Sequence, residues 1–291
     1  MKGWMIYSKE TLSSKFGNHA FDWMKDSAKA HGLEVDLVFE EDLMAVSSER
    51  GLEILHLGRA VNLPDFVVMR SYALEMGRQL EALGVRLFNP TGPLEDAQDK
   101  WRTHQLLTLK GIPNPKTVYL ARTPVDFDWL MEQLGSPVVV KGLRGSKGED
   151  VYLIDEAADL LPLVDQYGNE NLLFQSFVKG ADGRDVRVHV IDGKALVAVE
   201  RIAASGFKSN FHQGGSAQAF TLTEEISELA TASAEALSLE IAGVDILLGA
   251  EGPTICEVNG IPGFRTVGVT STVDIPRSIF AYIAKSMVQD Q

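Results

Sequence analysis

Short apolar runs and helical patterns of apolar residues alternate through the first part of the chain. This alternation predicts strands joined by crossover helices, as in parallel βαβ units. The expected strands are residues 3–8, 35–39, 66–70 and 85–88, and the expected helices are 16–31 and 74–83. A cluster of helix-breaking residues at 89–93, Asn-Pro-Thr-Gly-Pro, then predicts a boundary between domains.

Beyond this cluster the pattern changes to helices, buried-type strands and hairpins. Residues 185–191 and 195–201 alternate apolar and polar positions on either side of Asp192-Gly193, a dipeptide that favours the type I′ turn of a hairpin. The other expected strands are 117–120, 138–141, 151–154 and 172–174, and the expected helices are 99–109, 125–134, 224–239 and 275–287.

The register of the 185–201 hairpin decides which polar side chains share a face. Strict alternation places Asp185, Arg187 and His189 on one face, with Arg187 diagonally near Glu200. A structural ion pair and a ligand site explain the Arg187 placement equally well. The same alternation puts Arg187 and Arg201 on opposite faces. We expect no ligand role for His189, because no second histidine shares its face.

A second hairpin carries a set of oxygen ligands. A three-residue loop at 250–252 places Asp245 directly across from Glu257, with Asn259 two residues further along the same face. Because like charges on neighbouring strands repel, this set indicates a cation between the side chains. Oxygen ligands favour Mg²⁺ or Mn²⁺ over zinc. The alternative is a solvent-facing acidic hairpin, and one residue of register slip would separate the pair.

Residues 142–150 form a glycine-rich segment between two expected strands. Glycines allow backbone amides to approach phosphate oxygens, and Lys147 adds positive charge. The segment lacks the strand-to-helix setting and the spacing of a P-loop or a dinucleotide fingerprint. Taken alone, it fits a mobile surface turn better than a phosphate site.

Composition limits the classes of function. The chain has 291 residues, 45% of them hydrophobic, and a formal net charge of −13. This charge argues against binding of bulk nucleic acid, and the small groups of basic residues favour a focused anionic ligand. The first residues lack the apolar run of a secretion signal and nowhere do 18 apolar residues follow one another, so neither a secretion signal nor a membrane span is expected. The single cysteine, Cys256, cannot form an internal disulfide, which favours the cytoplasm, and alternation places its thiol on the apolar side of the second hairpin.

The order of these features resembles the ATP-grasp carboxylate-amine ligases, most closely the RimK group, which includes the ribosomal-protein glutamate ligase. The resemblance covers residues 89–291 and implies an α/β ATP-grasp fold. It implies a Rossmann-like N-terminal domain at 1–90, a central lobe with a glycine-rich lid at 91–175 and a C-terminal lobe with the metal site at 176–291. The residues that carry it are Lys100, Lys141, the Gly-Ser-Lys-Gly sequence at 145–148, and segments 175–178, 185–187, 208–210, 245 and 257–259.

The resemblance also implies a role for each matched residue. Residues 260–268 depart from the usual pattern of the group, so the acceptor stays open, and Arg265 is expected either to hold a substrate carboxylate or to flank a helix. The implied ATP contacts are Lys100, Lys141, Ser146, Lys147, Gln175, Ser176, Phe177, Val178, Asp185, Lys208 and Asn210. The implied ligands of two Mg²⁺ or Mn²⁺ ions are Asp245, Glu257 and Asn259, and the implied catalytic residues are Arg187 and Arg201.

The resemblance implies an ATP-dependent ligase that joins an amino acid, L-glutamate by analogy, to a carboxylate through an acyl phosphate. The acceptor is a peptide, a carrier protein or a cofactor, and relatives assemble as dimers or tetramers. Two alternatives stay open: a small-molecule kinase on the same fold, and an ATP-binding regulatory module without turnover. Neither bulk nucleic acid nor a membrane is an expected partner.

Overall fold

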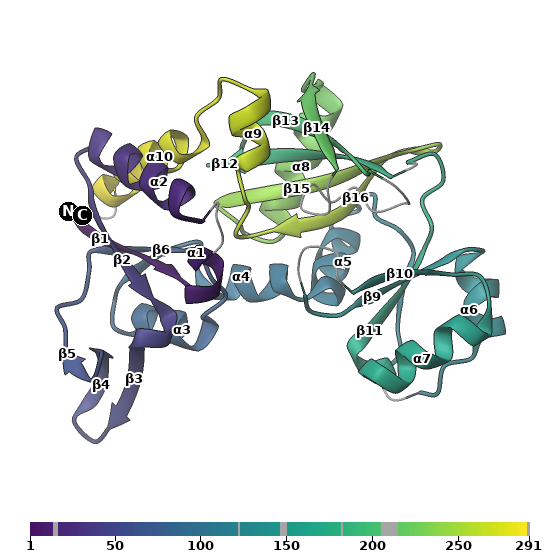
Figure 1. The fold of residues 1–291 in the computed structure, drawn as a ribbon, viewed down its shortest axis with the longest axis horizontal. Helices are drawn as coiled ribbons and strands as arrows, with labels where there is room; N and C mark the ends of the chain where they lie inside the picture. Colours follow the sequence, from purple (N-terminus) through teal and green to yellow (C-terminus); the bar gives the residue numbers. More distant parts are fainter. Residues whose placement is uncertain (14–16, 122, 146–149, 182, 205–214, 290–291) are drawn as a thin grey trace.

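The computed structural model describes residues 1–13, 17–121, 123–145, 150–181, 183–204 and 215–289. Figure 1 shows three parts in chain order: an N-terminal parallel sheet with its helices, a central antiparallel sheet and a C-terminal antiparallel sheet. Within these ranges, no helix combines the length and the apolar character that crossing a membrane requires.

The N-terminal sheet is parallel, with strand order β2-β1-β6-β7. Nearly all residues of β1 and β6 are buried, as expected for strands covered on both faces. Helices α2 and α10 pack on one face, and α3 and α4 pack on the other. The elements are β1 (Lys2–Tyr7), α1 (Lys9–Ser13), α2 (Gly17–Ala30), β2 (Glu34–Phe39), β6 (Phe66–Met69), α3 (Leu74–Ala82), β7 (Arg86–Phe88), α4 (Thr91–Gln98) and α10 (Ile275–Gln289).

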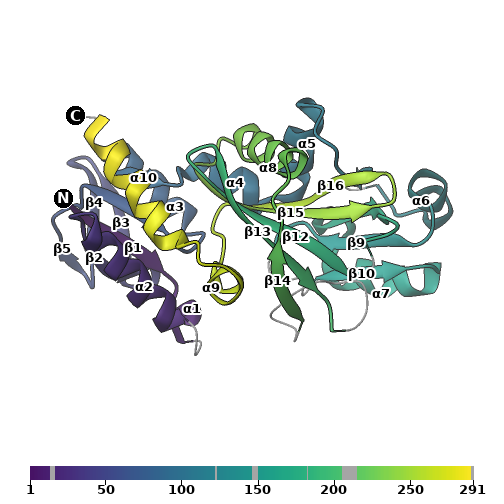
Figure 2. The same ribbon diagram turned by 90° about the horizontal axis from the view of Figure 1, so that it is seen from above.

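The C-terminal helix α10 therefore completes the core of the N-terminal sheet. Figure 2 shows α10 beside α2, and both contribute buried residues to one apolar cluster with β1 and β6. Within that cluster Phe280 and Ile283 are fully buried. The two ends of the chain are thus held in the same part of the molecule.

A small antiparallel sheet extends from the N-terminal part and was not expected from the sequence. It follows a 3₁₀ turn (Glu40–Asp42) and consists of β3 (Leu43–Ser48), β4 (Gly51–His56) and β5 (Arg59–Ala60). Most of its residues are exposed on both faces, so no clear alternation of apolar and polar positions marks these strands in the sequence.

The central lobe is a four-stranded sheet with order β10-β9-β11-β8. Helices α6 and α7 cover one face, where their leucines pack on Val138, Val140 and Phe174. The other face carries Lys141 and Gln175. The elements are α5 (Lys100–Leu109), β8 (Thr117–Tyr119), α6 (Phe127–Leu134), β9 (Val138–Gly142), β10 (Val151–Ile154), α7 (Ala157–Tyr167), a 3₁₀ turn (Asn169–Asn171) and β11 (Leu172–Ser176).

The C-terminal lobe is a five-stranded antiparallel sheet with order β14-β13-β12-β15-β16. Helix α8 packs on the face that carries Val186, Val188 and Val244. The opposite face carries the charged side chains of the candidate site. The elements are β12 (Arg184–Ile191), β13 (Lys194–Ile202), β14 (Ser216–Phe220), α8 (Glu224–Ala236), β15 (Ile241–Gly249), β16 (Gly252–Asn259) and α9 (Arg265–Thr270).

Asn89, in the expected boundary cluster, joins the N-terminal part to the C-terminal lobe. Its side chain is 1% exposed; Oδ1 accepts hydrogen bonds from the Glu240 and Ile241 amides, and Nδ2 donates to the Ile241 and Gly260 carbonyls. The cluster also starts helix α4 at Thr91, because glycine and proline in a first turn break no intrahelical hydrogen bond. The segment at this boundary is therefore held in place by the hydrogen bonds between the Asn89 side chain and the C-terminal lobe.

We predict that Asn89→Ala lowers the free energy of unfolding by about 2–4 kcal/mol, because it leaves several buried backbone groups without partners. Urea denaturation followed by circular dichroism measures the change. The exposed Asn62 provides the matched control, since Asn62→Ala removes an amide that makes no such bonds. Equal stability of the two variants would show that the hydrogen bonds of Asn89 do not stabilise the fold.

Candidate functional site

The β15–β16 hairpin places Asp245 directly opposite Glu257, as the sequence predicted. The turn itself differs from the prediction, because it has two residues, Ala250 and Glu251, and not three. A β-bulge at Cys256 supplies the additional residue that restores the Asp245–Glu257 pairing. Asn259 pairs with Gly243, and its Nδ2 lies 3.5 Å from Asp245 Oδ2.

The same bulge corrects the predicted position of Cys256. Simple alternation placed its thiol on the apolar side of the hairpin, but Sγ lies 3.7 Å from Lys141 Nζ across the gap between the two lobes. At a bulge two successive residues oppose one, so alternation fails locally. Burial raises the pKa of the Cys256 thiol, although Lys141 opposes this shift. The group is therefore a thiol at neutral pH.

Two arginines and two aspartates form a buried charge network on three adjacent strands. Arg187 Nε and Nη2 donate to the two Asp245 oxygens at 2.6 Å each. Arg201 makes the same bidentate contact with Asp185, and its Nη2 lies 2.9 Å from Asp245 Oδ2. Despite burial, the two arginines hold the pKa of Asp245 well below its ordinary value. Asp245 therefore stays ionised throughout the physiological range.

The network corrects the predicted arrangement of Arg187 and Arg201. Alternation placed them on opposite faces, but a bulge at Leu196 shifts the register and pairs Asp185 with Arg201. Both arginines thus lie on one face. The same shift turns Glu200 to the other face, where it binds Arg184 instead of lying near Arg187.

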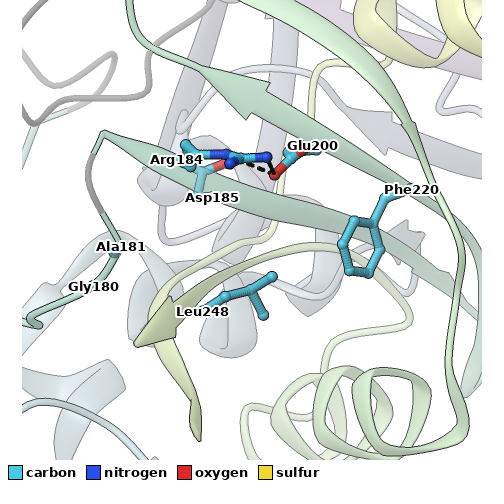
Figure 3. Close-up of a pocket in the computed structure, with 7 residues that line it drawn as sticks. All are labelled: Gly180, Ala181, Arg184, Asp185, Glu200, Phe220 and Leu248. Carbon is cyan, nitrogen blue, oxygen red and sulfur yellow. Dashed lines mark hydrogen bonds and ion pairs between the residues drawn. The ribbon is translucent and has the colours of Figure 1, made fainter. Parts of the chain in front are cut away.

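Arg184 and Glu200 line a cavity of about 320 Å³, which Asp185 of the charge network also borders (Figure 3). Phe220 and Leu248 form its apolar wall. Leu248 lies two residues beyond Ile246, which is buried against α8, so this wall belongs to the α8 side of the sheet. The charged face that holds Asp245 is therefore a separate candidate site.

Lys100 and Lys141 contribute the central lobe's side of the site. Lys141 is 9% exposed at the end of β9, and Lys100 Nζ donates to the Gly145 carbonyl at 3.1 Å. The Lys100 backbone amide also donates to the Leu143 carbonyl, so the start of α5 is tied to the glycine-rich segment. Burial, supported by nearby Lys141, lowers the pKa of Lys100, while Glu257 opposes the shift.

The segment 175–178 connects the two lobes as expected. Gln175 is 1% exposed, and its Nε2 forms hydrogen bonds with His104 and Thr117. Its side chain therefore belongs to the buried polar contacts of the central lobe. Val178 lies against Gly249 at the end of β15, where an added Cβ would come within 2.6 Å of it. Ser176, Phe177 and Val178 are half-buried. Their backbone is thus placed beside the β15–β16 hairpin.

The remaining residues named from the sequence are four that the structure does not describe and one exposed arginine. Ser146, Lys147, Lys208 and Asn210 are outside the described residues. Arg265 is exposed at the start of α9.

The sequence did not reveal the contribution of β6's carboxyl end, where Tyr72 lies close enough to Glu257 and Arg187 for both charges to affect its pKa. Its position after a strand of parallel type was the available signal.

The residues present fit an oxygen-coordinated divalent ion by their chemistry. Asp245 and Glu257 are carboxylates, Asn259 adds an amide, and the Glu257 carboxylate makes no hydrogen bond or ion pair with another described residue. Within the described ranges, no three His, Cys, Asp or Glu side chains cluster closely enough to hold a metal. An ion here would therefore need the Asn259 amide or oxygens from a bound ligand.

Comparisons with known proteins place this geometry in context. Residues 97–283 match the model of the RimK-like ATP-grasp domain. A "Probable alpha-L-glutamate ligase" of Thioalkalivibrio sulfidiphilus is 35% identical over 274 residues, which cover 90% of each chain. One of Parasynechococcus marenigrum is 38% identical over 208 residues. That match covers 70% of this chain but only 44% of the longer relative.

Solved structures of low sequence identity share the fold. The RimK domain ATP-grasp protein from Sphaerobacter thermophilus superposes with a TM-score of 0.74 at 18% identity, over 97% of this chain and 99% of that one. The ATP-grasp ligase PsnB, complexed with minimal precursor, Mg and ADP, gives 0.70 at 17% identity, over 99% and 98% of the two chains.

We predict that stability falls as the pH drops from about 6.5 towards 4, because burial lowers the pKa of His104 and of His189 to about 4 in the folded chain. In this window the unfolded chain takes up protons that the folded chain excludes, so unfolding becomes easier by up to about 1.4 kcal/mol per pH unit for each histidine. Denaturant titrations at stepped pH measure the slope. His189→Gln should reduce it, and a slope unchanged from the wild type would contradict the assignment. The exposed His19 gives the control variant His19→Gln.

Proposed function

The chain belongs to the RimK-like ATP-grasp family of ligases, and on this basis we propose that it forms an amide bond between L-glutamate and a substrate carboxylate, driven by ATP. The expected family and fold are confirmed, because the family model matches residues 97–283 and ATP-grasp structures superpose over nearly the whole chain. The sequence-based kinase and regulatory alternatives are not favoured by any feature of the site.

The observation that carries this proposal is the convergence of opposite charges on the facing surfaces of the two lobes. Phosphoryl transfer to a carboxylate requires neutralisation of two approaching anions, and positioned cations supply it. Carboxylates that lie beside these cationic side chains can coordinate a divalent ion through their oxygens. The cationic side chains are Lys100, Lys141, Arg187 and Arg201, and the carboxylates are Asp185, Asp245 and Glu257.

We assign roles from chemistry and position. Asp245, Glu257 and Asn259 would hold Mg²⁺ or Mn²⁺, which supplies charge neutralisation at the phosphate oxygens. Lys100 and Lys141 lie at the start of α5 and the end of β9, where they bind phosphate oxygens as point charges.

We assign Arg187, which is 16% exposed, to the transferring phosphoryl group, while Arg201, at 7%, keeps Asp185 and Asp245 in place. Asp185 would thereby act mainly through that network, in addition to its expected ribose contact.

An acyl-phosphate intermediate would make water exclusion important. Within the glycine-rich segment the structure describes residues 142–145 and 150, and the contacts of residues 143 and 145 with Lys100 place this end of the segment over the start of α5. A cover at this position protects a reactive anhydride from hydrolysis. The amino group of the second substrate then displaces inorganic phosphate and leaves ADP, phosphate and the amide.

The substrate classes follow from the relatives. Proteins 31–38% identical to this chain bear the name probable alpha-L-glutamate ligase, which supports L-glutamate as the amine donor. A peptide acceptor is supported more weakly, by the PsnB complex with its precursor peptide PsnA2 at 18% identity. We propose a peptide that ends in a free carboxylate, with a carrier protein or a cofactor as the remaining possibilities. A homodimer or homotetramer stays an expectation from the family.

We predict that Glu257→Gln abolishes ADP release in the presence of ATP, Mg²⁺, L-glutamate and acceptor, with a loss of about 10²-fold or more. The free energy of unfolding should change little, because the Glu257 side chain makes no hydrogen bond or ion pair with a described residue that the substitution would remove. Glu251→Gln, at the exposed turn of the same hairpin, is the matched control. Full activity of Glu257→Gln over a Mg²⁺ titration would exclude the proposed metal site.

Hydroxylamine tests the proposed intermediate directly. We predict that added hydroxylamine converts the acceptor into a hydroxamate in an ATP-dependent manner, because this nucleophile captures acyl phosphates in place of the amino acid. Mass spectrometry of the acceptor detects the product, and a reaction without enzyme provides the background. A stable phosphate ester without hydroxamate would instead establish a kinase.

A further inference from the structure

The N-terminal sheet contains a topological switch point that faces the candidate site. From β1 the chain continues to β2 on one side of β1, and it later returns to β6 on the other side. The strand order β2-β1-β6-β7 therefore reverses direction between β1 and β6. In open parallel sheets, ligands bind in the crevice at the carboxyl ends of the strands on either side of such a point. Here those ends are Tyr7 on β1 and the segment 70–72 after β6.

Buried polar atoms without partners gather at these strand ends. Tyr7 is 2% exposed and Ser71 is 9% exposed, and neither hydroxyl has a hydrogen-bond partner among the described residues. Arg70 Nε is also buried and unpartnered in this part of the chain. Folded proteins satisfy most buried polar groups, so three such atoms on adjacent strand ends indicate a missing acceptor.

The loop that follows the expected metal ligands lies against these strand ends. Arg70 Nη2 donates to the Pro262 carbonyl at 3.2 Å, and the guanidinium lies 5.5 Å from the centre of the Phe264 ring and 6.0 Å from that of Tyr7. Two aromatic rings thus fix the plane of Arg70 and leave Nε as an available donor. Residues of both the N-terminal part and the C-terminal lobe therefore surround Arg70.

The crevice also adjoins the reacting face. Pro262 packs on Gly243, where an added Cβ would lie 2.8 Å from Pro262 Cβ and 3.8 Å from Arg187 Nε. Tyr72 lies where the charges of Glu257, Arg70 and Arg187 all act on it, and burial, followed by Glu257, raises its pKa. Its hydroxyl therefore remains a donor at neutral pH.

We propose that the crevice between the carboxyl ends of β1 and β6 binds a non-reacting substrate carboxylate through the Arg70 guanidinium and the Ser71 hydroxyl. An ionised carboxylate accepts hydrogen bonds without donating any, so it satisfies guanidinium and hydroxyl donors together. The inference rests on the ligase function proposed above, in which both L-glutamate and a peptide acceptor carry such a group. The crevice then sets the distance between the held carboxylate and the reacting atoms near Arg187.

Calorimetric titration of the full chain, loaded with a non-hydrolysable ATP analogue and Mg²⁺, tests the site. The probes are L-glutamate and the dipeptide L-alanyl-L-glutamate, so the weakened probe identifies which substrate supplies the carboxylate. We expect Arg70→Gln to weaken one probe by about tenfold or more, the effect of losing a hydrogen bond to a charged group, while nucleotide affinity stays unchanged.

Two further variants separate binding from folding. Ser71→Ala should weaken the same probe without loss of stability, because the Ser71 hydroxyl makes no hydrogen bond to any residue that the structure describes. Arg59→Gln, at an exposed position of the small sheet, should leave both affinities unchanged. L-Glutamine and L-isoglutamine, which each lack one carboxylate, extend the test: the wild type should discriminate against one of them, and Arg70→Gln should not.

The outcomes distinguish this inference from the ligase proposal. Equal affinities of the wild type, Arg70→Gln and Ser71→Ala for both probes would overturn the carboxylate site, even if amide formation is observed. Failure of the wild type to bind either probe would overturn it as well. If the probes bind through Arg70 but ATP, L-glutamate and acceptor yield no amide, the site stands and the ligase proposal fails.

Discussion

The buried network of Asp185, Arg187, Arg201 and Asp245 is the constraint on which the rest of the site depends. A single buried charge is costly, and breaking a buried pair leaves an uncompensated ion, so the four groups must remain together. Their bidentate contacts fix β13, β12 and β15 side by side at the point where Glu257 faces Asp245. The network thereby holds Asp245 ionised and in a defined position before any ligand arrives, which is the preorganisation that electrostatic catalysis requires.

The sequence predicted both hairpins of this lobe but not the bulges that align them. Asp192 and Gly193 adopt left-handed backbone conformations with φ of 52° and 68°, as the turn dipeptide indicated. The bulge at Leu196 could not be foreseen, because the apolar alternation near the turn fits either register and packing against α8 and α10 selects one. This bulge brings Arg201 onto the Asp185 face. At Cys256, a second bulge compensates for a shorter turn, so the metal-site pairing was predicted correctly from an incorrect loop length.

Other parts of the site escaped prediction because they depend on contacts between distant segments. Local periodicity reports which face of an element is buried, but it does not report what covers that face. Asn89 forms hydrogen bonds with residues 152 and 171 positions later, and Arg70 reaches Pro262 across 192 positions. The small sheet at 43–60 was missed for the opposite reason, since its residues are mostly exposed and carry no burial pattern. The four strands of the N-terminal parallel sheet had such a pattern and were predicted within a few residues, whereas the short helices α1 and α4 were not predicted.

The distribution of basic residues shows most clearly what folding adds to sequence. Neighbours in the chain separate in the structure: Arg184 turns to Glu200 on the α8 side, while Arg187 binds Asp245 on the opposite face. Residues far apart in sequence instead converge, and Lys100 joins Lys141 although they come from α5 and β9. In a chain of net charge −13, such convergence focuses positive potential at one site. An anion is thereby attracted only where paired carboxylates can also accept a divalent ion, which matches the charge pattern of a metal–nucleotide complex.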